Sequence, residues 1–314
     1  MPIVSCVSTH SGNSLPMPSA CVLALGSFDG VHLAHRALLS RAKSLRDGAF
    51  ADAACGAFCF LQPPADLLLG NAAPKHLCTL EQKLEHFASC GIEIAILADF
   101  SALQSLSPDA FVKEILQEQC HAVAAVCGFN YRFGKNGKGD ANLLGSLMPF
   151  TEVQAEIRME GDTVSSTRIR SLLTKGDVER AARLLSYSYT LRATVLHGKA
   201  LGRKLGTPTI NQAFPDKALI PSHGVYLTRC RMDGIEKFGV SNVGVRPTVE
   251  NNAHANCETY LLDFSGDLYG KTVDVSFLKM IRPEIKFSSK EELIAQIELD
   301  EQAARRMICD GDLF

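Results

Sequence analysis

The chain has 314 residues, 46% hydrophobic and 21% charged, a composition that argues against a largely disordered protein. At roughly 150 residues per domain, this length indicates about two domains. The 32 basic and 34 acidic residues give a net charge of −2. This balance argues against a general nucleic-acid or membrane-surface binder, so any anion site must be local.

The cysteines and the N-terminal region indicate in which cellular compartment the protein is expected. Eight of the eleven cysteines fall at or before Cys127, and no pair has the two-residue spacing of a zinc or thioredoxin-type motif. We expect small buried hydrophobes in a reducing cytoplasm, with a metal or redox role as the alternative. The apolar run at residues 21–25 is far too short to span a bilayer and has no basic residue before it, which predicts an untargeted cytoplasmic protein.

In the first half, short apolar runs alternate with amphipathic segments. Buried strands are expected at residues 21–25, 57–61, 92–97 and 122–127, and helices at 34–45, 80–90 and 107–119. Two helix starts carry capping signals: Thr79 with Gln82 forms a capping box, and Ser107 precedes Pro108. The alternation predicts a mostly parallel sheet with helices on both faces.

The pattern changes after a helical stretch at residues 166–184, so we place a domain boundary near Ser186. Short runs rich in β-branched or aromatic residues follow at 190–196, 225–230, 238–243, 258–264 and 272–278. Glycine-bearing turns such as Asp233-Gly234 separate several of them, which predicts an antiparallel barrel or sandwich. A final amphipathic helix is expected at 289–307, with Leu293, Ile297 and Ala304 on one stripe.

The first candidate motif connects the first predicted strand and helix. It reads Gly26-Ser27-Phe28-Asp29-Gly30-Val31-His32-Leu33-Ala34-His35. Glycines permit a tight turn, and free N–H groups at a helix N-terminus favour a phosphate. His32 and His35 would share one face and could donate hydrogen bonds to a phosphorus centre. The alternative is a strand–helix turn whose histidines only cap or pack.

Two further segments of the first domain could bind nucleotide or flavin. Residues 164–170 place hydroxyls at a helix start before Arg168 and Arg170, which suits a polyphosphate. Residues 128–140 combine aromatic, basic and glycine residues in a loop that could lie over a planar heterocycle and its phosphates. Their alternatives are an ordinary helix cap with a solvated basic face and a solvated glycine-rich loop.

The second domain has a glycine-rich basic loop at residues 198–206, which is not a Walker A sequence. Thr209 and Asn211 follow it and would point the same way on an extended segment, where two neutral oxygens could help to hold Mg²⁺. Glu258 lies in a strand-like run; directed into a barrel interior, it could accept a proton in phosphoryl transfer. A polar turn and a surface glutamate are the alternatives.

These segments in this order resemble the prokaryotic bifunctional riboflavin kinase/FAD synthetase family, from about Leu23 to Met307. The kinase resemblance rests on residues 198–206, 207–211, 241–248 and 258–270. Residues 26–35, 128–134 and 164–170 resemble the FMN adenylyltransferase module of the His-x-Gly-His superfamily. The resemblance implies a Rossmann-like nucleotidyltransferase domain at 1–186 and an antiparallel β-barrel riboflavin kinase domain with a terminal helix at 187–314.

The resemblance also implies two activities: riboflavin is phosphorylated to FMN, and FMN is then adenylylated to FAD with release of pyrophosphate. Each step takes ATP as co-substrate, with Mg²⁺ as cofactor. The implied catalytic residues are Glu258, His32, His35 and Arg168. The implied nucleotide contacts are Gly26, Phe28, Asp29, Gly30, Ser165, Ser166, Thr167, Gly198, Lys199, Gly202, Gly206, Thr209 and Asn211. Thr209 and Asn211 would also contact the metal, and Gly128, Asn130, Arg132 and Phe133 would contact flavin.

Departures from the family pattern are concentrated in the first domain. Ala34 stands where the family usually has glycine, and Gln62-Pro63-Pro64 replaces a Pro-His-Pro-like segment. An alternative is therefore a riboflavin kinase with a weakly active or inactive adenylyltransferase domain. A non-catalytic flavin or nucleotide sensor is less favoured. The expected partners are small molecules, without nucleic acid or membrane, for a monomer or weak homo-oligomer.

Overall fold

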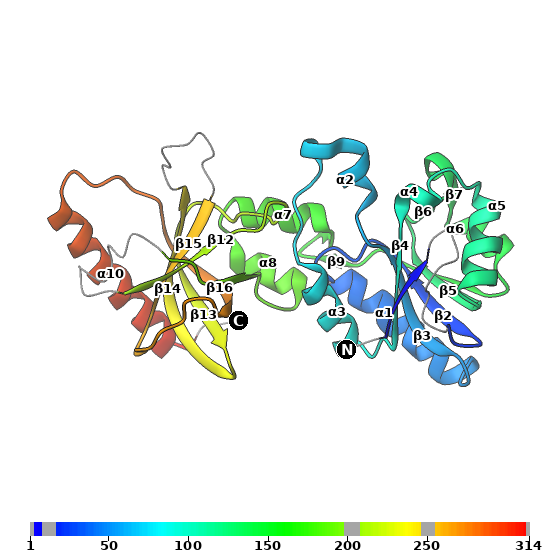
Figure 1. The fold of residues 1–314 in the computed structure, drawn as a ribbon, viewed down its shortest axis with the longest axis horizontal. Helices are drawn as coiled ribbons and strands as arrows, with labels where there is room; N and C mark the ends of the chain where they lie inside the picture. Colours follow the sequence, from blue (N-terminus) through cyan, green and yellow to red (C-terminus); the bar gives the residue numbers. More distant parts are fainter. Residues whose placement is uncertain (1–2, 8–16, 198–207, 246–254, 312–314) are drawn as a thin grey trace. The chain divides into compact units, whose positions relative to one another are not determined.

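The computed structural model describes residues 3–7, 17–197, 208–245 and 255–311 of the chain (Figure 1). The chain forms two compact units, Met1–Ser165 and Ser166–Phe314. Both helices of the predicted 166–184 stretch belong to the second unit. The boundary near Ser186 stays a prediction.

The first unit is built on a sheet of six parallel strands in the order β1-β4-β3-β2-β5-β8. The strands are β1 (Ile3–Val7), β2 (Cys21–Leu25), β3 (Ala54–Phe60), β4 (Ile94–Ala98), β5 (Ala122–Gly128) and β8 (Thr151–Gln154). The four central strands and their parallel arrangement confirm the prediction. The edge strands β1 and β8 were not predicted; β8 in particular lacks an apolar run, because an edge strand is only partly buried.

Helices cover both faces of this sheet, as predicted (Figure 1). They are α1 (Leu33–Ala49), α2 (Pro64–Leu69), η1 (Gly70–Ala72), α3 (Leu80–Ser89), α4 (Phe100–Leu103), α5 (Pro108–Ala110), η2 (Phe111–Gln119), η3 (Lys135–Gly137) and α6 (Ala141–Leu147). Alternate residues of β2 pack in two different cores: Leu23 lies with η2 and α6, whereas Val22 lies with α1 and α3. The predicted helix at 107–119 is π-helical from Phe111 onward.

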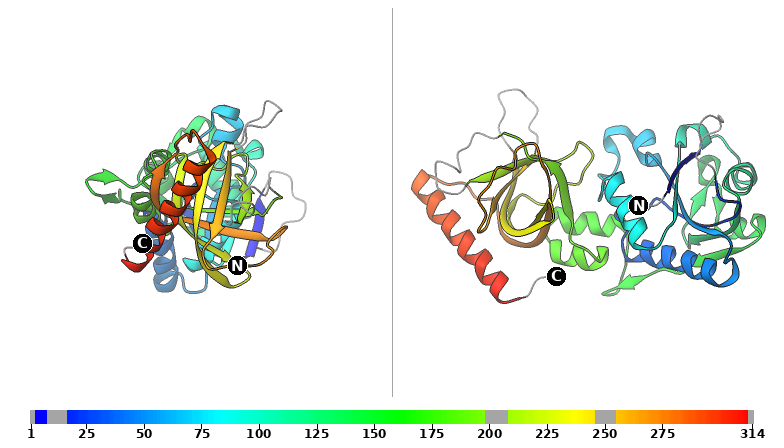
Figure 2. Two further views of the ribbon diagram at one scale, coloured as in Figure 1. Left: turned by 90° about the vertical axis from the view of Figure 1, so that its left-hand side faces the viewer. Right: turned by 60° about the horizontal axis from the view of Figure 1, so that its bottom comes forward.

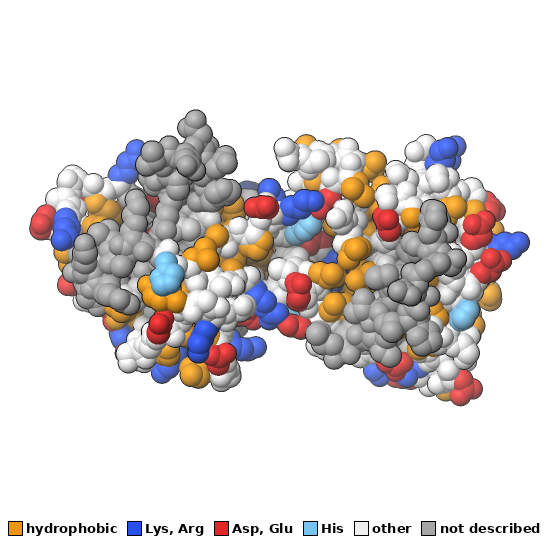
Figure 3. All heavy atoms as spheres, in the orientation of Figure 1, with side chains coloured by type: hydrophobic (Ala, Val, Ile, Leu, Met, Phe, Trp, Pro, Cys, Tyr) orange, Lys and Arg blue, Asp and Glu red, His pale blue; other side chains and the backbone are white. Residues whose placement is uncertain are grey.

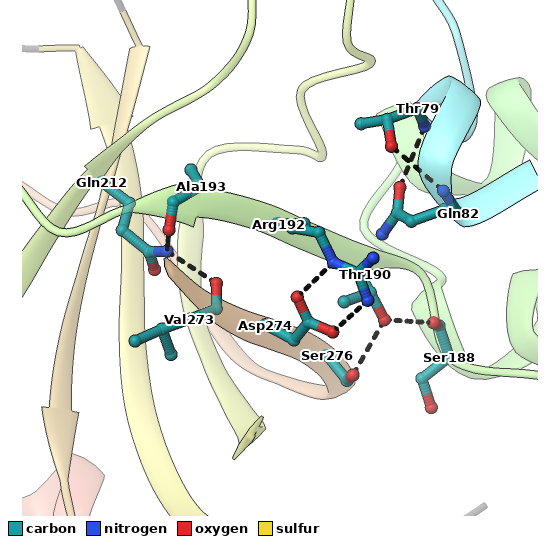
Figure 4. A network of polar contacts seen from close by, with 10 residues as sticks. All are labelled: Thr79, Gln82, Ser188, Thr190, Arg192, Ala193, Gln212, Val273, Asp274 and Ser276. Carbon is teal, nitrogen blue, oxygen red and sulfur yellow. Dashed lines mark hydrogen bonds and ion pairs between the residues drawn. The ribbon is translucent and has the colours of Figure 1, made fainter. Parts of the chain in front are cut away.

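Two short hairpins complete the first unit, β6 (Arg132–Phe133) with β7 (Gly139–Asp140) and β9 (Arg158–Met159) with β10 (Asp162–Thr163). The predicted capping box is present at the start of α3. The Gln82 backbone N–H donates to Thr79 Oγ1 at 3.2 Å, and Thr79 N donates to Gln82 Oε1 at 2.9 Å (Figure 4). This reciprocal cap fixes where α3 begins.

The second unit begins with α7 (Ser166–Thr174) and α8 (Val178–Leu185) and continues into a nearly closed antiparallel barrel (Figure 2). Its strands are β11 (Thr190–Thr194), β12 (Thr209–Ala213), β13 (Gly224–Met232), β14 (Ile235–Val245), β15 (Ala255–Leu261) and β16 (Thr272–Pro283). They run in the order β11-β16-β13-β14-β15-β12, and a bridge between Leu196 and Asn211 joins the two ends. Of the predicted alternatives, the barrel is confirmed.

Side-chain hydrogen bonds reinforce the closure of the barrel (Figure 4). The buried Gln212 amide on β12 donates to the carbonyl oxygens of Ala193, at 2.6 Å, and Val273, at 2.8 Å. On the neighbouring strands, Arg192 Nε lies 2.7 Å from Asp274 Oδ1. These contacts connect β11, β12 and β16 where the barrel closes.

The last helix, α10 (Lys290–Cys309), follows its N-cap Ser289, the first residue of the predicted range 289–307, and lies against the barrel (Figures 1 and 2). Its fully buried Ala304 packs with Leu227, Leu262 and Leu278. Within the described residues, no helix is both long and apolar enough to cross a membrane. On the face shown in Figure 3, basic and acidic side chains are interspersed across the described surface.

Ten cysteines have described side chains; all ten are free and seven are buried. Burial raises the pKa of thiols such as Cys55, to about 12. These thiols therefore stay protonated and pack as small hydrophobic groups, as predicted.

Candidate functional site

The turn between β2 and α1 contains the first predicted motif. Gly30 has a φ of 76°, which glycine adopts without strain, whereas Phe28 (51°) and Val31 (33°) are held at positive φ. Strained residues of this kind cluster at functional sites. A Cβ on Gly26 would lie 3.2 Å from the buried Phe28 ring, which also packs edge-on against Phe87 of α3. The backbone of the turn is therefore fixed by packing.

Three hydrogen bonds attach this turn to the residues just before and within α3. They join Asp29 Oδ1 to Leu77 N (2.9 Å), Gly30 N to Cys78 Sγ (3.4 Å) and Lys83 Nζ to Ser27 O (3.1 Å). The partners are 48 to 56 residues apart in the chain. No spacing pattern in the sequence could have connected them, and Lys83 was not among the predicted residues.

His32 and His35 lie together at the N-terminus of α1. His32 is 4% exposed, and its Nδ1 accepts a hydrogen bond from His35 N at 3.4 Å. The two rings stack with their centroids 3.7 Å apart. Because Nδ1 of His32 accepts, its Nε2 is left as the donor.

The environment of His35 keeps its imidazole neutral. Burial, the neighbouring His32 and the charge of Lys83 hold the pKa of His35 well below its usual range. Its Nδ1 is buried and has no hydrogen-bond partner among the described residues. A neutral imidazole has one donor and one acceptor nitrogen, so His35 can donate a hydrogen bond to a phosphate oxygen without carrying charge.

The loop after β5 contains the predicted flavin contacts Gly128, Asn130, Arg132 and Phe133. Asn130 and Arg132 are exposed. Phe133 is 5% exposed and packs against Phe111 in the core, so its ring supports the loop from beneath. Phe129, which was not predicted, is 50% exposed and is the aromatic side chain of this loop most open to solvent.

The predicted phosphate contacts Ser165, Ser166, Thr167 and Arg168 lie where the two units join along the chain. Ser165 ends the first unit, and the other three begin α7 in the second. Their approach to His32 stays a prediction. The segment Gln62-Pro63-Pro64, which departs from the family pattern, lies before and at the start of α2. Gln62 is exposed, and Pro63 is the N-cap of that helix.

In the second unit, Glu258 is the middle member of a row across three strands. It is in register with Asn211 of β12 on one side and Asn242 of β14 on the other. Directly opposed residues of antiparallel strands project from the same face, so the three side chains are neighbours. Asn256, two residues earlier on β15, donates from Nδ2 to Glu258 Oε1 at 3.1 Å. The carboxylate is thus surrounded by amide groups.

Glu258 does not face the barrel interior, the direction considered from the sequence. Its neighbours Cys257 and Thr259 occupy that interior, where the Thr259 hydroxyl lies 2.7 Å from Ser241 Oγ. Since side chains alternate along a strand, Glu258 projects from the opposite face. That face is covered by α10.

A groove of about 290 Å³ lies between this face of the barrel and α10. Glu258, Thr209 and Asn242 supply polar groups to its lining, and the charged residues Arg282, Glu284, Asp300 and Glu301 also line it. Much of the remaining wall is apolar and consists of Val225, Val240, Ile285, Phe287, Leu293 and Ile297. Leu293 and Ile297 belong to the predicted stripe of the last helix, so part of that stripe lines a groove while Ala304 packs in the core. Apolar walls with a few polar groups are typical of small-molecule sites.

A buried ion pair fixes α10 at this groove. Arg282 of β16 donates from Nε and Nη2 to Asp300 of α10 at 2.8 to 3.1 Å, and Gln296 donates to the same carboxylate at 2.9 Å. Asp300 is 2% exposed. Arg282 and Asp300 both line the groove, so the pair sets the distance between its two walls.

Two family models match the chain: riboflavin kinase over residues 185–308 and FAD synthetase over residues 15–168. A bifunctional riboflavin kinase/FMN adenylyltransferase from Listeria monocytogenes is 36% identical, with 90% of this chain and 91% of that protein aligned. A protein of the same description from Pseudomonas fluorescens is 35% identical, with 94% and 95% aligned. The chain belongs to the bifunctional riboflavin kinase/FMN adenylyltransferase family.

The fold of the whole chain also has a solved counterpart. A crystal structure from Streptococcus pneumoniae, described as a macrolide-efflux protein, superposes with a TM-score of 0.86 at 28% identity. The match covers 96% of this chain and 99% of that one. It supports the arrangement of an α/β unit followed by a barrel.

For this member of the riboflavin kinase/FMN adenylyltransferase family, the structure brings together two groups of predicted residues. Gly26 to His35 form the turn that leads into α1 and the start of that helix. In the second group, Asn211 of β12 is the cross-strand neighbour of Glu258 of β15, and Thr209 lies two residues before Asn211 on β12. The predicted contacts Gly198, Lys199, Gly202 and Gly206 lie outside the described residues. Asn242 and the Arg282–Asp300 pair were missed, although Asn242 lies inside a segment that carried the resemblance.

The predicted metal ligands fit Mg²⁺ by chemistry. Within the described residues, no group of three or more His, Cys, Asp or Glu side chains is placed to hold a metal ion. Thr209 and Asn211 offer a hydroxyl and an amide oxygen, hard neutral ligands of the type that supplement phosphate oxygens and water around Mg²⁺.

Proposed function

We propose that this chain makes FMN from riboflavin and ATP in its second unit, and FAD from FMN and ATP in its first. The family membership and the two separate constellations of polar groups support this assignment. We propose domains at 1–186 and 187–314 acting in the cytoplasm as a monomer or weak homo-oligomer. The observation that carries the kinase assignment is Glu258 in a groove whose walls are largely apolar.

In the kinase reaction, the flavin ring would occupy the apolar part of the groove, with its ribityl chain directed to Glu258. Glu258 would accept the proton of the 5′-hydroxyl as that oxygen attacks the γ-phosphorus of ATP. The bond to the β,γ-bridging oxygen breaks and ADP leaves. Asn211, Asn242 and Asn256 would hold the carboxylate in place through amide contacts and cross-strand packing.

Thr209 and Asn211 would hold Mg²⁺ together with the phosphates of ATP. The metal would offset the charge of those phosphates. Since Asn211 is in register with Glu258, the same strand pairing would fix the general base beside the metal ligands. Gly198, Lys199, Gly202 and Gly206 are proposed to contact the nucleotide through the preceding loop.

In the adenylyltransferase reaction, an oxygen of the FMN phosphate would attack the α-phosphorus of ATP and pyrophosphate would leave. No covalent enzyme intermediate is required, so the protein contributes positioning and charge stabilisation. His32 and His35 would donate hydrogen bonds at the N-terminus of α1, where the helix dipole favours an anion. Arg168 and Ser166 are proposed to contact the same phosphates.

A chain that only phosphorylates riboflavin is the second candidate, because Ala34 lies between the two histidines at the second position of α1. A product assay separates the candidates: full-length protein is incubated with riboflavin, ATP and Mg²⁺, and the flavins are resolved by chromatography. Formation of FMN followed by FAD is expected. FMN accumulating without FAD, even when FMN is supplied, would contradict the second activity; tight flavin binding without turnover would indicate a sensor.

A further inference from the structure

Lys83 is a buried lysine beneath the strained turn that leads into α1. It is 7% exposed and lies in the first turn of α3, whose other buried residues are Gln82, Leu84 and Phe87. Its Nζ donates to Ser27 O at 3.1 Å, which places the ammonium group directly against the turn. Its charge also reaches His35, whose pKa it helps to lower.

The charge of Lys83 has no counter-ion within the described part of the chain. An ammonium group has three N–H donors, and Ser27 O accepts from one of them. The nearest acidic side chain of the motif, Asp29, uses one carboxylate oxygen to accept from Leu77 N. A buried cation that lacks a partner is unfavourable, so a lysine at this position needs a compensating role.

The neutral imidazole of His35 indicates what that role is. A pyrophosphate group carries several negative charges, and hydrogen bonds from an uncharged imidazole and the N-terminus of α1 offset them only in part. His35 also has a buried Nδ1 without a described partner, so the turn holds an unpaired imidazole nitrogen and a cation without a described counter-ion. A polyphosphate at this turn would satisfy both of them.

We propose that Lys83 binds the β- and γ-phosphates of ATP, and hence the pyrophosphate product, during adenylyl transfer to FMN. The inference rests on the proposed function of the first unit and adds to it a cation that the sequence motifs did not include. The hydrogen bond to Ser27 O holds the ammonium group at the turn before the nucleotide arrives. Lys83 thus supplies a positive charge that the neutral His35 imidazole lacks.

The test uses the full-length chain with Lys83→Met, which keeps the length of the side chain and removes its charge. Lys113→Met on η2 is the matched control, because Lys113 is exposed. The assay runs the reaction in reverse, from FAD and inorganic pyrophosphate to FMN and ATP, which only the first unit would catalyse. We expect the KM for pyrophosphate to rise at least tenfold in Lys83→Met, with Lys83→Arg recovering part of it and riboflavin phosphorylation unchanged.

Thermal unfolding without ligand separates binding from a structural role. Removing an uncompensated buried charge should leave the melting temperature unchanged or raise it. A lower melting temperature with an unchanged KM for pyrophosphate, or a chain that fails to fold, would overturn the proposal and make Lys83 structural. If the wild-type chain forms FAD and Lys83→Met matches it, only this inference fails; if the wild type forms none, the proposed function of the first unit fails.

Discussion

In the first unit the proposed reactive groups come from one turn of the chain, whereas in the second they come from strands far apart in sequence. His32 and His35 are separated by one helical turn and depend on the strained backbone between β2 and α1. Glu258 and Asn211 are neighbours only because β12 and β15 pair in one register. A slip by one residue would move Glu258 to the other face of the sheet.

This difference has a chemical counterpart. The first site presents backbone N–H groups, the neutral ring of His35 and the Lys83 ammonium group, which suits an anion that brings its own nucleophile. The second presents a carboxylate among amides, which suits a hydroxyl substrate that must lose a proton. Each of these two groups of residues is therefore matched to one of the two steps, and a substitution in one group should spare the other step.

The largest expected effect is that of Glu258→Gln. Without a general base, riboflavin phosphorylation should fall by about 10²- to 10⁴-fold, while riboflavin binding and FAD formation from supplied FMN persist. Initial rates from chromatography measure both steps in one preparation. Glu236→Gln, on the exposed surface of β14, is the matched control. Near-normal FMN formation by Glu258→Gln would mean that the base lies elsewhere.

The reciprocal test is His32→Ala. Loss of one preorganised donor should lower FAD formation by about 10²- to 10³-fold, with riboflavin phosphorylation spared. The kinase activity of the same protein is the internal control for folding. If both rates fell together, the two units would be coupled or the chain misfolded, and the comparison between independent sites would fail.

The sequence predicted local features well. The apolar runs located the central strands, the capping signals located the starts of α3 and α5, and the Asp233-Gly234 turn joins β13 to β14 as expected. The first motif was also visible, because its residues are contiguous. Each of these features depends on residues that are neighbours in the chain.

Features that depend on pairing were not predictable in the same way. Nothing in the sequence specifies that Glu258 lies opposite Asn242, or that Lys83 reaches Ser27 across 56 residues. The Arg282–Asp300 pair likewise requires α10 to return to the end of β16. A single sequence gives periodicity within an element, whereas tertiary contacts decide which elements meet.

Asp300→Asn tests how far the second site depends on α10. Removing one charge of a buried pair leaves Arg282 uncompensated, and we expect a loss of about 2 kcal/mol in the free energy of unfolding, with a higher KM for riboflavin. This is below the about 3 to 5 kcal/mol seen for fully buried pairs, because Arg282 keeps some exposure to water. Urea unfolding and kinase kinetics measure the two effects.

Glu298→Gln on the same helix is the control for Asp300→Asn. Glu298 is exposed and is not among the residues that line the groove, so loss of its charge should have little effect. Equal losses in the two variants would show that the charge of α10 matters in general and that the Arg282–Asp300 pair has no special role at the groove.

A smaller effect is expected for Ala34→Gly. If the Cβ of Ala34 crowds a phosphate at the N-terminus of α1, relief of about 1 kcal/mol corresponds to about a fivefold rise in FAD formation. Ala37→Gly, one helical turn further along, is the control for the helix destabilisation of up to about 1 kcal/mol that glycine causes. An unchanged or lower rate in Ala34→Gly would show that the position tolerates a methyl group.

The last expected effect concerns pH and belongs to the first unit alone. Because the pKa of folded His35 lies well below 6.5, the unfolded chain takes up a proton below pH 6.5 that the folded chain does not. Stability should therefore fall as pH decreases from 6.5 toward the folded pKa, by at most about 1.4 kcal/mol per pH unit from this group. Above pH 6.5 the group contributes no slope.

His35→Gln removes this contribution. Between pH 7.5 and pH 5.5, the free energy of unfolding of the wild type should therefore fall by more than that of the variant. Urea unfolding at the two pH values measures it, and His121→Gln, an exposed histidine of the same unit, is the control. A slope that is identical in wild type and His35→Gln would mean that His35 titrates normally when folded. The neutral His35 imidazole proposed for the anion site would then be wrong, and the contrast between a neutral imidazole in the first site and a carboxylate in the second would be lost.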